Sequence, residues 1–95
     1  MDSETELQKA ILEALREIGC WVFRVNSGRY GKVWLAPEGT PDLCLPALGW
    51  MEVKLPGRKP SVAQQVWHKR AENEGVRVAV VHSVTEAIST YLAWR

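Results

Sequence analysis

Residues 39–54 read GTPDLCLPALGWMEVK, and they decide the fold and the chemistry that we expect. A Pro-Ala-Leu-Gly turn separates two short apolar segments, which predicts a pair of adjacent strands joined by that turn. Side chains alternate along a strand, so Glu52 and Lys54 share one face of the second strand with Trp50. The apolar residues between them face the other way. Two charged residues on one face of an otherwise apolar strand indicate a functional site.

Asp42 opens the first of these strands, ten residues before Glu52. Adjacent antiparallel strands would bring the two carboxylates together, with the Lys54 ammonium beside them. Carboxylate oxygens are the ligands that hard cations such as Mg²⁺ prefer. The stretch therefore predicts a cation site with a positive side chain directed at the same place.

The rest of the chain predicts helices and strands around this pair. Amphipathic periodicity, capping signals and glycine stops indicate the helices, and alternating or β-branched runs indicate the strands. In chain order we expect helix 3–18, strand 20–26, a loop or hairpin over 27–38 with a candidate strand at 32–36, strands 42–45 and 49–54, a loop 55–60, helix 61–74, strand 76–82 and helix 83–94. The last helix should bury Val84, Ala87, Ile88, Tyr91 and Leu92.

This order of elements predicts an α/β fold. We expect a central mixed sheet of about four or five strands flanked by three helices. The strand–helix–strand crossover from Glu52 through Val76 should be parallel and right-handed.

Ninety-five residues with 46% apolar content suffice for one small domain, 1–95. The five Trp residues supply bulky packing and are consistent with a homodimer interface. The acidic N-terminus has no basic segment or apolar run typical of a signal peptide, and no apolar stretch has the length of a membrane span. Cys20 and Cys44 lie outside metal-type spacings, so we expect two buried thiols in a reducing cytoplasm.

The net charge of +1 is uninformative, but the distribution of charge is not. Residues 24–70 carry eight basic side chains against three acidic ones, and two of those three are Asp42 and Glu52. A basic surface around an acidic pocket is typical of a metal-dependent enzyme acting on a polyanion, although an ordinary mixed surface would give the same count. No clustered His and Cys set indicates a zinc site.

Several motifs together resemble a known nuclease family. Pro-Asp at 41–42 followed by Glu-Val-Lys at 52–54 looks like the PD-(D/E)XK nuclease signature. Around it, RVNSG at 24–28, GTPDL at 39–43 and S-x-x-Q-x-x-W-H at 61–68 occur in the order found in the virus-type replication-repair nuclease (VRR-NUC) domain. The likeness covers nearly the whole chain. It implies a restriction-endonuclease-like core.

The resemblance implies a metal-dependent, structure-specific DNA endonuclease that hydrolyses phosphodiester bonds with Mg²⁺ or Mn²⁺. Small phage and bacterial members resemble homodimeric Holliday-junction resolvases that cut branched DNA during repair. We therefore expect a homodimer that acts on DNA in the cytoplasm of a bacterial host, at the nucleoid. The alternatives are a less selective nuclease or nickase, a nucleic-acid-binding module without turnover, and a structural domain in which residues 52 and 54 form an ion pair.

The family pattern assigns roles at the site. Asp42 and Glu52 would be metal ligands, together with the backbone carbonyl of Val53. Lys54 would orient the attacking water or stabilise charge on the phosphate. Because burial of a carboxylate pair is costly without a cation, we predict that replacing either one by Ala abolishes metal-dependent cleavage while the fold survives.

Two helices add further candidates. The resemblance implies a metal-associated glutamate in the first helix, a few residues before a Gln, which Gln8 fits. Glu4 lies on the apolar stripe of this helix and would act through a water or on a second ion, whereas Glu6 has a capping role and is the fallback. A solvated first-turn carboxylate is the alternative for Glu4. Gln64 matches a glutamine near the active site of the family, and it equally fits a capping box with Ser61. We expect His68 to pack or hydrogen bond and not to act as a general base.

Polar residues away from the carboxylates are candidates for DNA contact. They lie around the first strand and its turn and in the loop 55–60: Arg24, Asn26, Arg29, Lys32, Arg58 and Lys59. Turn chemistry explains Asn26 without a function, and a solvated connector explains the loop.

Overall fold

The computed structural model describes residues 3–95, with all of their side chains except those of Arg29, Tyr30 and Trp34. Within these residues the elements are α1 (Glu4–Glu17), β1 (Phe23–Arg24), β2 (Arg29–Tyr30), β3 (Val33–Trp34), β4 (Leu43–Leu45), β5 (Gly49–Val53), α2 (Val62–Asn73), β6 (Val78–Val81) and α3 (Val84–Trp94). No helix in this part of the chain combines the length and the apolar character needed to cross a membrane.

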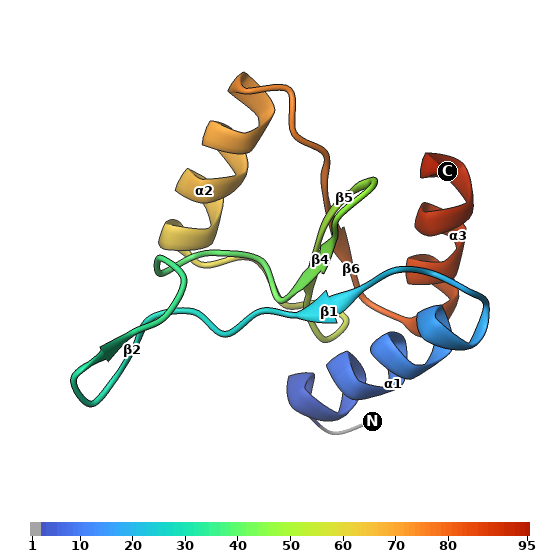
Figure 1. Ribbon diagram of the computed structural model, residues 1–95, viewed down its shortest axis with the longest axis horizontal. Coiled ribbons are helices and arrows are strands. Elements are labelled where there is room, and N and C mark those ends of the chain that lie inside the picture. Colours follow the sequence, from blue (N-terminus) through green and yellow to red (C-terminus); the bar gives the residue numbers. More distant parts are fainter. Residues whose placement is uncertain (1–2) are drawn as a thin grey trace.

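The sheet is mixed and has the order β1-β4-β5-β6 (Figure 1). β4 pairs with β1 and with β5 in antiparallel fashion, and β5 pairs with β6 in parallel. β2 and β3 form a separate two-stranded hairpin that extends from the body of the protein (Figure 1). The predicted α/β architecture, with three helices and four main strands in the described residues, is confirmed, as is the parallel pairing across α2.

The sheet separates two layers of helices. α1 and α3 pack together on one face, where Ile11, Met51 and Val53 are fully buried in a shared apolar core. α2 covers the other face (Figure 1). There Trp67 meets Trp50 edge-on, with ring centroids 5.2 Å apart. The alternation predicted for β5 therefore holds: its apolar residues face α1, and its other face is turned to α2.

The helix boundaries agree with the prediction to within one residue at each end, because each helix begins after a serine cap. Ser3, Ser61 and Ser83 accept hydrogen bonds from the backbone N–H three positions later. The predicted burial of Leu92 in the last helix is wrong. Leu92 is 50% exposed, since at 100° per residue it lies beside the buried stripe that ends at Tyr91.

The predicted strand at 20–26 is wrong in its length, because only Phe23–Arg24 pairs with β4. β4 itself is three residues long, and two of its residues pair with that segment. Beyond it the chain turns to the hairpin, where the Ala36 N–H donates to the Asn26 carbonyl over 3.1 Å. The strand predicted at 76–82 is likewise limited to the four residues that pair with β5.

Candidate active site

Asp42 is placed by a loop that packs against the start of α2. Gly39 in this loop has a φ of +89°, and a Cβ there would lie 2.6 Å from the Ala63 carbonyl carbon. Only glycine tolerates both the left-handed backbone and this close approach. The buried Thr40 hydroxyl donates to the Pro37 carbonyl and closes the turn. Asp42 therefore enters β4 from a rigid turn.

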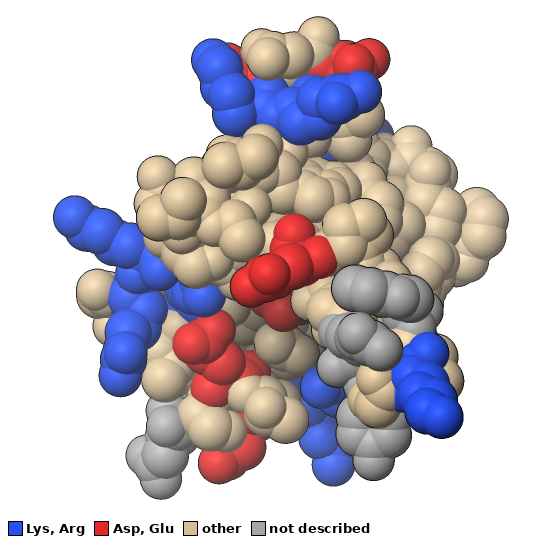
Figure 2. Space-filling model, turned by 90° about the vertical axis from the view of Figure 1, so that its left-hand side faces the viewer, with Lys and Arg blue, Asp and Glu red and all other residues tan. Residues whose placement is uncertain are grey.

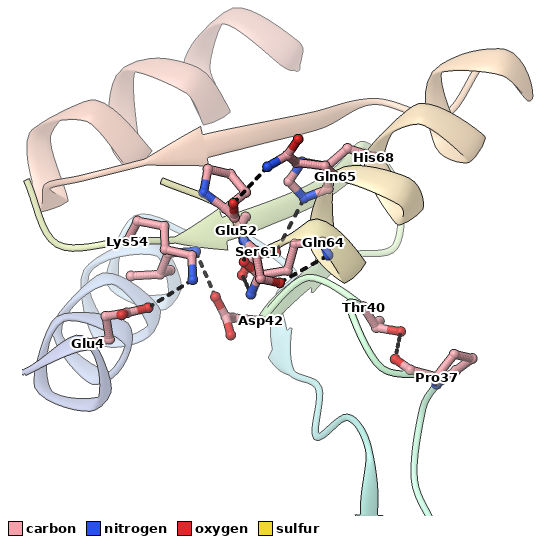
Figure 3. A network of polar contacts seen from close by, with 12 residues as sticks. Glu4, Pro37, Thr40, Asp42, Glu52, Lys54, Ser61, Gln64, Gln65 and His68 are labelled. Carbon is pink, nitrogen blue, oxygen red and sulfur yellow. Dashed lines mark hydrogen bonds and ion pairs between the residues drawn. The ribbon is translucent and has the colours of Figure 1, made fainter. Parts of the chain in front are cut away.

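The Asp42 carboxylate points at the end of β5. The Val53 N–H donates to Asp42 Oδ2 over 2.7 Å (Figure 3). In a strand the N–H and C=O of one residue point to the same edge. The N–H groups of Trp50 and Lys54 donate to the carbonyls of Arg77 and Val81, so they point to the opposite edge of β5. The Val53 carbonyl therefore shares the edge on which Asp42 lies.

The Glu52 side chain points from β5 towards α2 and is fully buried beneath that helix. Gln64 Nε2 donates to Glu52 Oε2 over 3.2 Å, and His68 Nε2 lies 3.3 Å from Glu52 Oε1 (Figure 3). Gln64 and His68 are four residues apart, so one face of α2 presents both side chains. Each oxygen of the Glu52 carboxyl thus has a neighbour on this helix.

Burial raises the pKa of Glu52 to about 9, and a hydrogen bond and charge repulsion from Asp42 add to the effect of burial. Lys54 acts in the opposite direction, and Glu4 adds a smaller upward contribution. Glu52 is therefore protonated at neutral pH when no cation is present. Burial also lowers the pKa of His68, and the charge of Lys54 lowers it further, so its imidazole is neutral.

Lys54 links the carboxylates to α1. Its ammonium lies 3.6 Å from Glu4 Oε1, and its side chain is only 12% exposed (Figure 3). Its backbone carbonyl lies 3.2 Å from His82 Nδ1. Glu6 instead stays with the helix cap, since its N–H and its carboxylate both contact the Ser3 hydroxyl. The structure thus brings Glu4, and not Glu6, to the site.

Gln64 completes the cap of α2 and also contacts Glu52. Its Oε1 accepts from the Ser61 N–H over 2.7 Å, and its N–H donates to Ser61 Oγ, which completes a capping box. Its Nε2 is left to donate to Glu52. The hydrogen bond from the Ser61 N–H fixes the orientation of the Gln64 side-chain amide. As a result the Gln64 Nε2 faces the carboxyl of Glu52.

The candidate DNA-contact residues lie in two places. Arg24 and Asn26 line a cleft that also contains Asp42. Lys32, Arg58 and Lys59 are exposed, the first in the hairpin turn and the others in the loop before α2. The side chain of Arg29 lies outside the described part of the chain. Figure 2 shows the side of the molecule that is on the left in Figure 1, where acidic side chains lie in the middle, with Lys and Arg side chains on both sides and above.

His68 is the residue at the site that the sequence prediction left out of the catalytic set. Its contact with Glu52 confirms the expectation that it hydrogen bonds. The available signal was the spacing of four between Gln64 and His68, which places both on one helix face. That spacing does not say which face meets the sheet, so the partner could not be named.

The donor chemistry of the site suits a hard cation. No group of three or more His, Cys, Asp and Glu side chains suited to a metal occurs within residues 3–95. The predicted direct ligands are, however, two carboxylates and one backbone carbonyl. Asp42 is close enough to Glu52 to raise its pKa, and the Val53 carbonyl lies on the edge of β5 that Asp42 faces. Such an oxygen set fits Mg²⁺ or Mn²⁺, which keep several waters.

Comparisons with known proteins identify no relative of this chain. A scan against protein-family models, a search of curated proteins and a search of solved structures each found no match.

Proposed function

We propose that this protein is a metal-dependent endonuclease of the VRR-NUC type, within the PD-(D/E)XK superfamily, that hydrolyses phosphodiester bonds in branched DNA. The observation that supports the proposal best is the meeting of Asp42, Glu52 and Lys54 at adjacent ends of β4 and β5. The N–H of Val53, which lies between Glu52 and Lys54, donates a hydrogen bond to Asp42. A fully buried carboxyl beside a half-buried carboxylate is costly in a purely structural domain, even with an ammonium nearby.

Asp42, Glu52 and the Val53 carbonyl would hold Mg²⁺ or Mn²⁺. When bound, the ion acidifies a water and neutralises charge on the phosphate. Burial and the neighbouring Asp42 carboxylate together raise the pKa of Glu52 to about 9, and a bound cation would relieve both effects. Binding of the ion would release that proton, because a carboxylate must be ionised to act as a strong ligand.

Lys54 and Glu4 would act on the water and the phosphate. The Lys54 ammonium donates hydrogen bonds, so it can orient an attacking water and stabilise the negative charge that builds on the phosphate. Its ion pair with Glu4 limits the directions in which it points. Gln64 and His68 hold the carboxyl of Glu52 from the opposite side.

DNA would approach the face that carries the acidic centre and the surrounding basic residues. Arg24 and Asn26 lie beside Asp42, and Arg58 and Lys59 precede α2, so cations are available on two sides of the site. Cleavage of both strands of a junction calls for two such sites, and a homodimer with two-fold symmetry would supply them.

The test is cleavage of a labelled four-way junction beside matched linear duplex and single strand, with Mg²⁺, with Mn²⁺ and with chelator. We expect metal-dependent, symmetric nicks on the junction. Asp42→Asn and Glu52→Gln should each lower the cleavage rate by a factor of about 10² or more, since each removes a charged ligand. Circular dichroism should show that both variants keep the fold.

Other outcomes would change the proposal in defined ways. Equal cleavage of all three substrates would leave a nuclease or nickase without structural selectivity. Binding of DNA without cleavage in any metal would indicate a binding module. Full activity of Asp42→Asn after metal titration would overturn the assignment of the site.

A further inference from the structure

A cleft of about 520 Å³ opens beside Asp42, between α1, the end of β1 and the β2–β3 hairpin. Asp42 is part of its lining, so the cleft and the proposed metal site share one residue. Sites for small ligands in proteins typically measure about 300–1,000 Å³. The cleft is therefore large enough for a molecule the size of a nucleotide.

The polar side of the cleft consists of side chains that the protein itself does not use. Gln8 from α1, and Arg24 and Asn26 from the segment around β1, line the cleft. None of these three side chains has a hydrogen-bond or ion-pair partner among the residues that the structure describes. Two amides and one guanidinium supply donors and acceptors for a ligand with a polar edge and a negative charge.

The opposite side of the cleft is apolar and comes from the hairpin. Val33 and Leu35 line it, and 58% of Val33 and 37% of Leu35 remain exposed. The hairpin is held in place by backbone bonds, in which Leu35 donates to the Gly28 carbonyl and Gly28 donates to the Ala36 carbonyl. Two aliphatic side chains are thus presented to solvent on an anchored segment.

We propose that this cleft holds one unpaired nucleotide of the DNA, next to the phosphate that is cut. Its base would lie against Val33 and Leu35, its edge would meet the amides of Gln8 and Asn26, and Arg24 would contact a phosphate. This inference rests on the proposed function, because Asp42 connects the cleft to the reacting phosphate.

The chemistry of the cleft selects an unpaired base over a paired one. The faces of a paired base are covered by its neighbours in the stack, and its Watson–Crick edge is used by its partner. Only a base outside the helix can offer a free face to aliphatic side chains together with a free edge to amides. The cleft would thus direct the enzyme to bulges, flaps and frayed branch points, which contain such bases.

The experiment compares two duplexes that differ in a single base. One carries a bulged 2-aminopurine nucleotide and the other an abasic bulge with the same backbone, and binding to the full chain is measured with Ca²⁺. We expect the wild type to bind the first duplex about fivefold more tightly, the size expected from burying part of a base on apolar surface. The fluorescence of the 2-aminopurine should change on binding.

Variants locate the effect. Leu35→Ala and Asn26→Ala should each bring the ratio of the two dissociation constants close to one. Val66→Ala is the matched control, since Val66 is an exposed aliphatic residue of α2 outside the cleft, and it should keep the wild-type ratio. Because the abasic comparison uses the unaltered protein, a variant that fails to fold does not remove the test.

The outcomes for the cleft and for catalysis are separate. Equal affinity of the wild type for both duplexes overturns the assignment of the cleft, whether or not the enzyme cuts DNA. A preference for the base without cleavage in Mg²⁺ or Mn²⁺ supports the cleft and overturns the proposed catalysis. Loss of the preference in Val66→Ala as well would place the base elsewhere and overturn the inference.

Discussion

Glu52 combines complete burial with an acidic neighbour. Gln64 and His68 satisfy both of its oxygens, so its hydrogen-bonding needs are met while its charge is not. Burial of an ionised carboxylate without a counter-ion costs several kcal/mol, roughly, and protonation avoids that cost. Under the proposed function, Glu52 would therefore have two states, a protonated one without a cation and an ionised one beside a cation.

This pKa predicts how stability depends on pH when a chelator is present. The folded state raises the pKa of Glu52 from 4.5 to about 9, so it binds the proton more tightly than the unfolded state does. The stabilisation is fully present below pH 4.5 and is lost as the pH rises towards 9. Between pH 5.5 and 8.5 the free energy of unfolding should fall by about 4 kcal/mol because of this group.

Urea unfolding of the wild type and of Glu52→Gln at several pH values measures this effect. The variant carries a neutral amide, so its free energy of unfolding should change much less over the same range. Parallel curves for the two proteins would show that Glu52 is ionised in the folded state at neutral pH. Subtracting one curve from the other removes the contribution of the remaining titrating groups.

A second prediction concerns the stability of the protein with and without a metal ion at the carboxyls of Asp42 and Glu52. At pH 8, Mn²⁺ at about 100 times its dissociation constant should stabilise the wild type by about 2.7 kcal/mol, since it binds only the folded site. Asp42→Asn should lose most of this stabilisation. Thermal unfolding with Mn²⁺ and with chelator measures it, and an equal response of both proteins would place the bound ion elsewhere.

At the scale of elements, the site depends on the contact between the Asp42 loop and α2. Gly39→Ala should lower the free energy of unfolding by about 3 kcal/mol or more, because the new methyl group meets the Ala63 backbone and the φ is +89°. Gly57 is the matched control. Its φ is +83°, but nothing lies within 4 Å of an added Cβ, so Gly57→Ala should cost only about 1 kcal/mol. Chemical denaturation compares the two, and equal costs would mean that the loop moves away from α2.

The start of α2 allows its capping and active-site roles to be separated. Ser61→Ala removes one half of the capping box and should cost about 1 kcal/mol of stability while cleavage is retained. Gln64→Glu keeps the acceptor for the Ser61 N–H but removes the donor to Glu52 and adds a negative charge. It should lower cleavage by a factor of about ten or more. If the two variants lose activity in proportion to their stability, Gln64 acts only as a cap.

The elements themselves were largely predictable, and the exceptions have one cause. Helix α2 and the pair β4–β5 follow from caps, periodicity and a turn, which are properties of neighbouring residues. The strand predicted at 20–26 is shorter because a strand needs a partner, and β4 is too short to pair with all of it. Strand length is thus a property of two segments and not of one.

At the scale of the whole molecule, the reactivity of the two cysteine thiols can show whether both layers of the fold unfold together. Cys20 belongs to the core beneath α1 and α3, whereas Cys44 pairs with Trp50 in the strands that face α2. Both are buried, free thiols, and burial raises the pKa of each. If the sheet and its two layers unfold together, both thiols should become reactive at the same rate.

Thiol labelling followed by mass spectrometry tests this cooperativity. Each thiol should react more slowly than an exposed cysteine by a factor of about 10³ or more, which reflects the rarity of global opening. Similar factors for the two sites would indicate one cooperative unit. A Cys44 that reacts much faster than Cys20 would show that α2 detaches while the other layer stays folded.

The amino-acid sequence by itself determined the order of the helices and strands, the pairing of β4 with β5, and the residues at the acidic centre, because these follow from local patterns and from one adjacent pair of strands. Only the tertiary structure decided that Glu52 loses all contact with solvent, that α2 turns Gln64 and His68 onto it, and that the hairpin forms one wall of a cleft beside Asp42. The contacts of Glu52 with α2 join residues 12 and 16 positions apart. Their geometry depends on how a helix is placed on a sheet, which no periodicity within either element specifies.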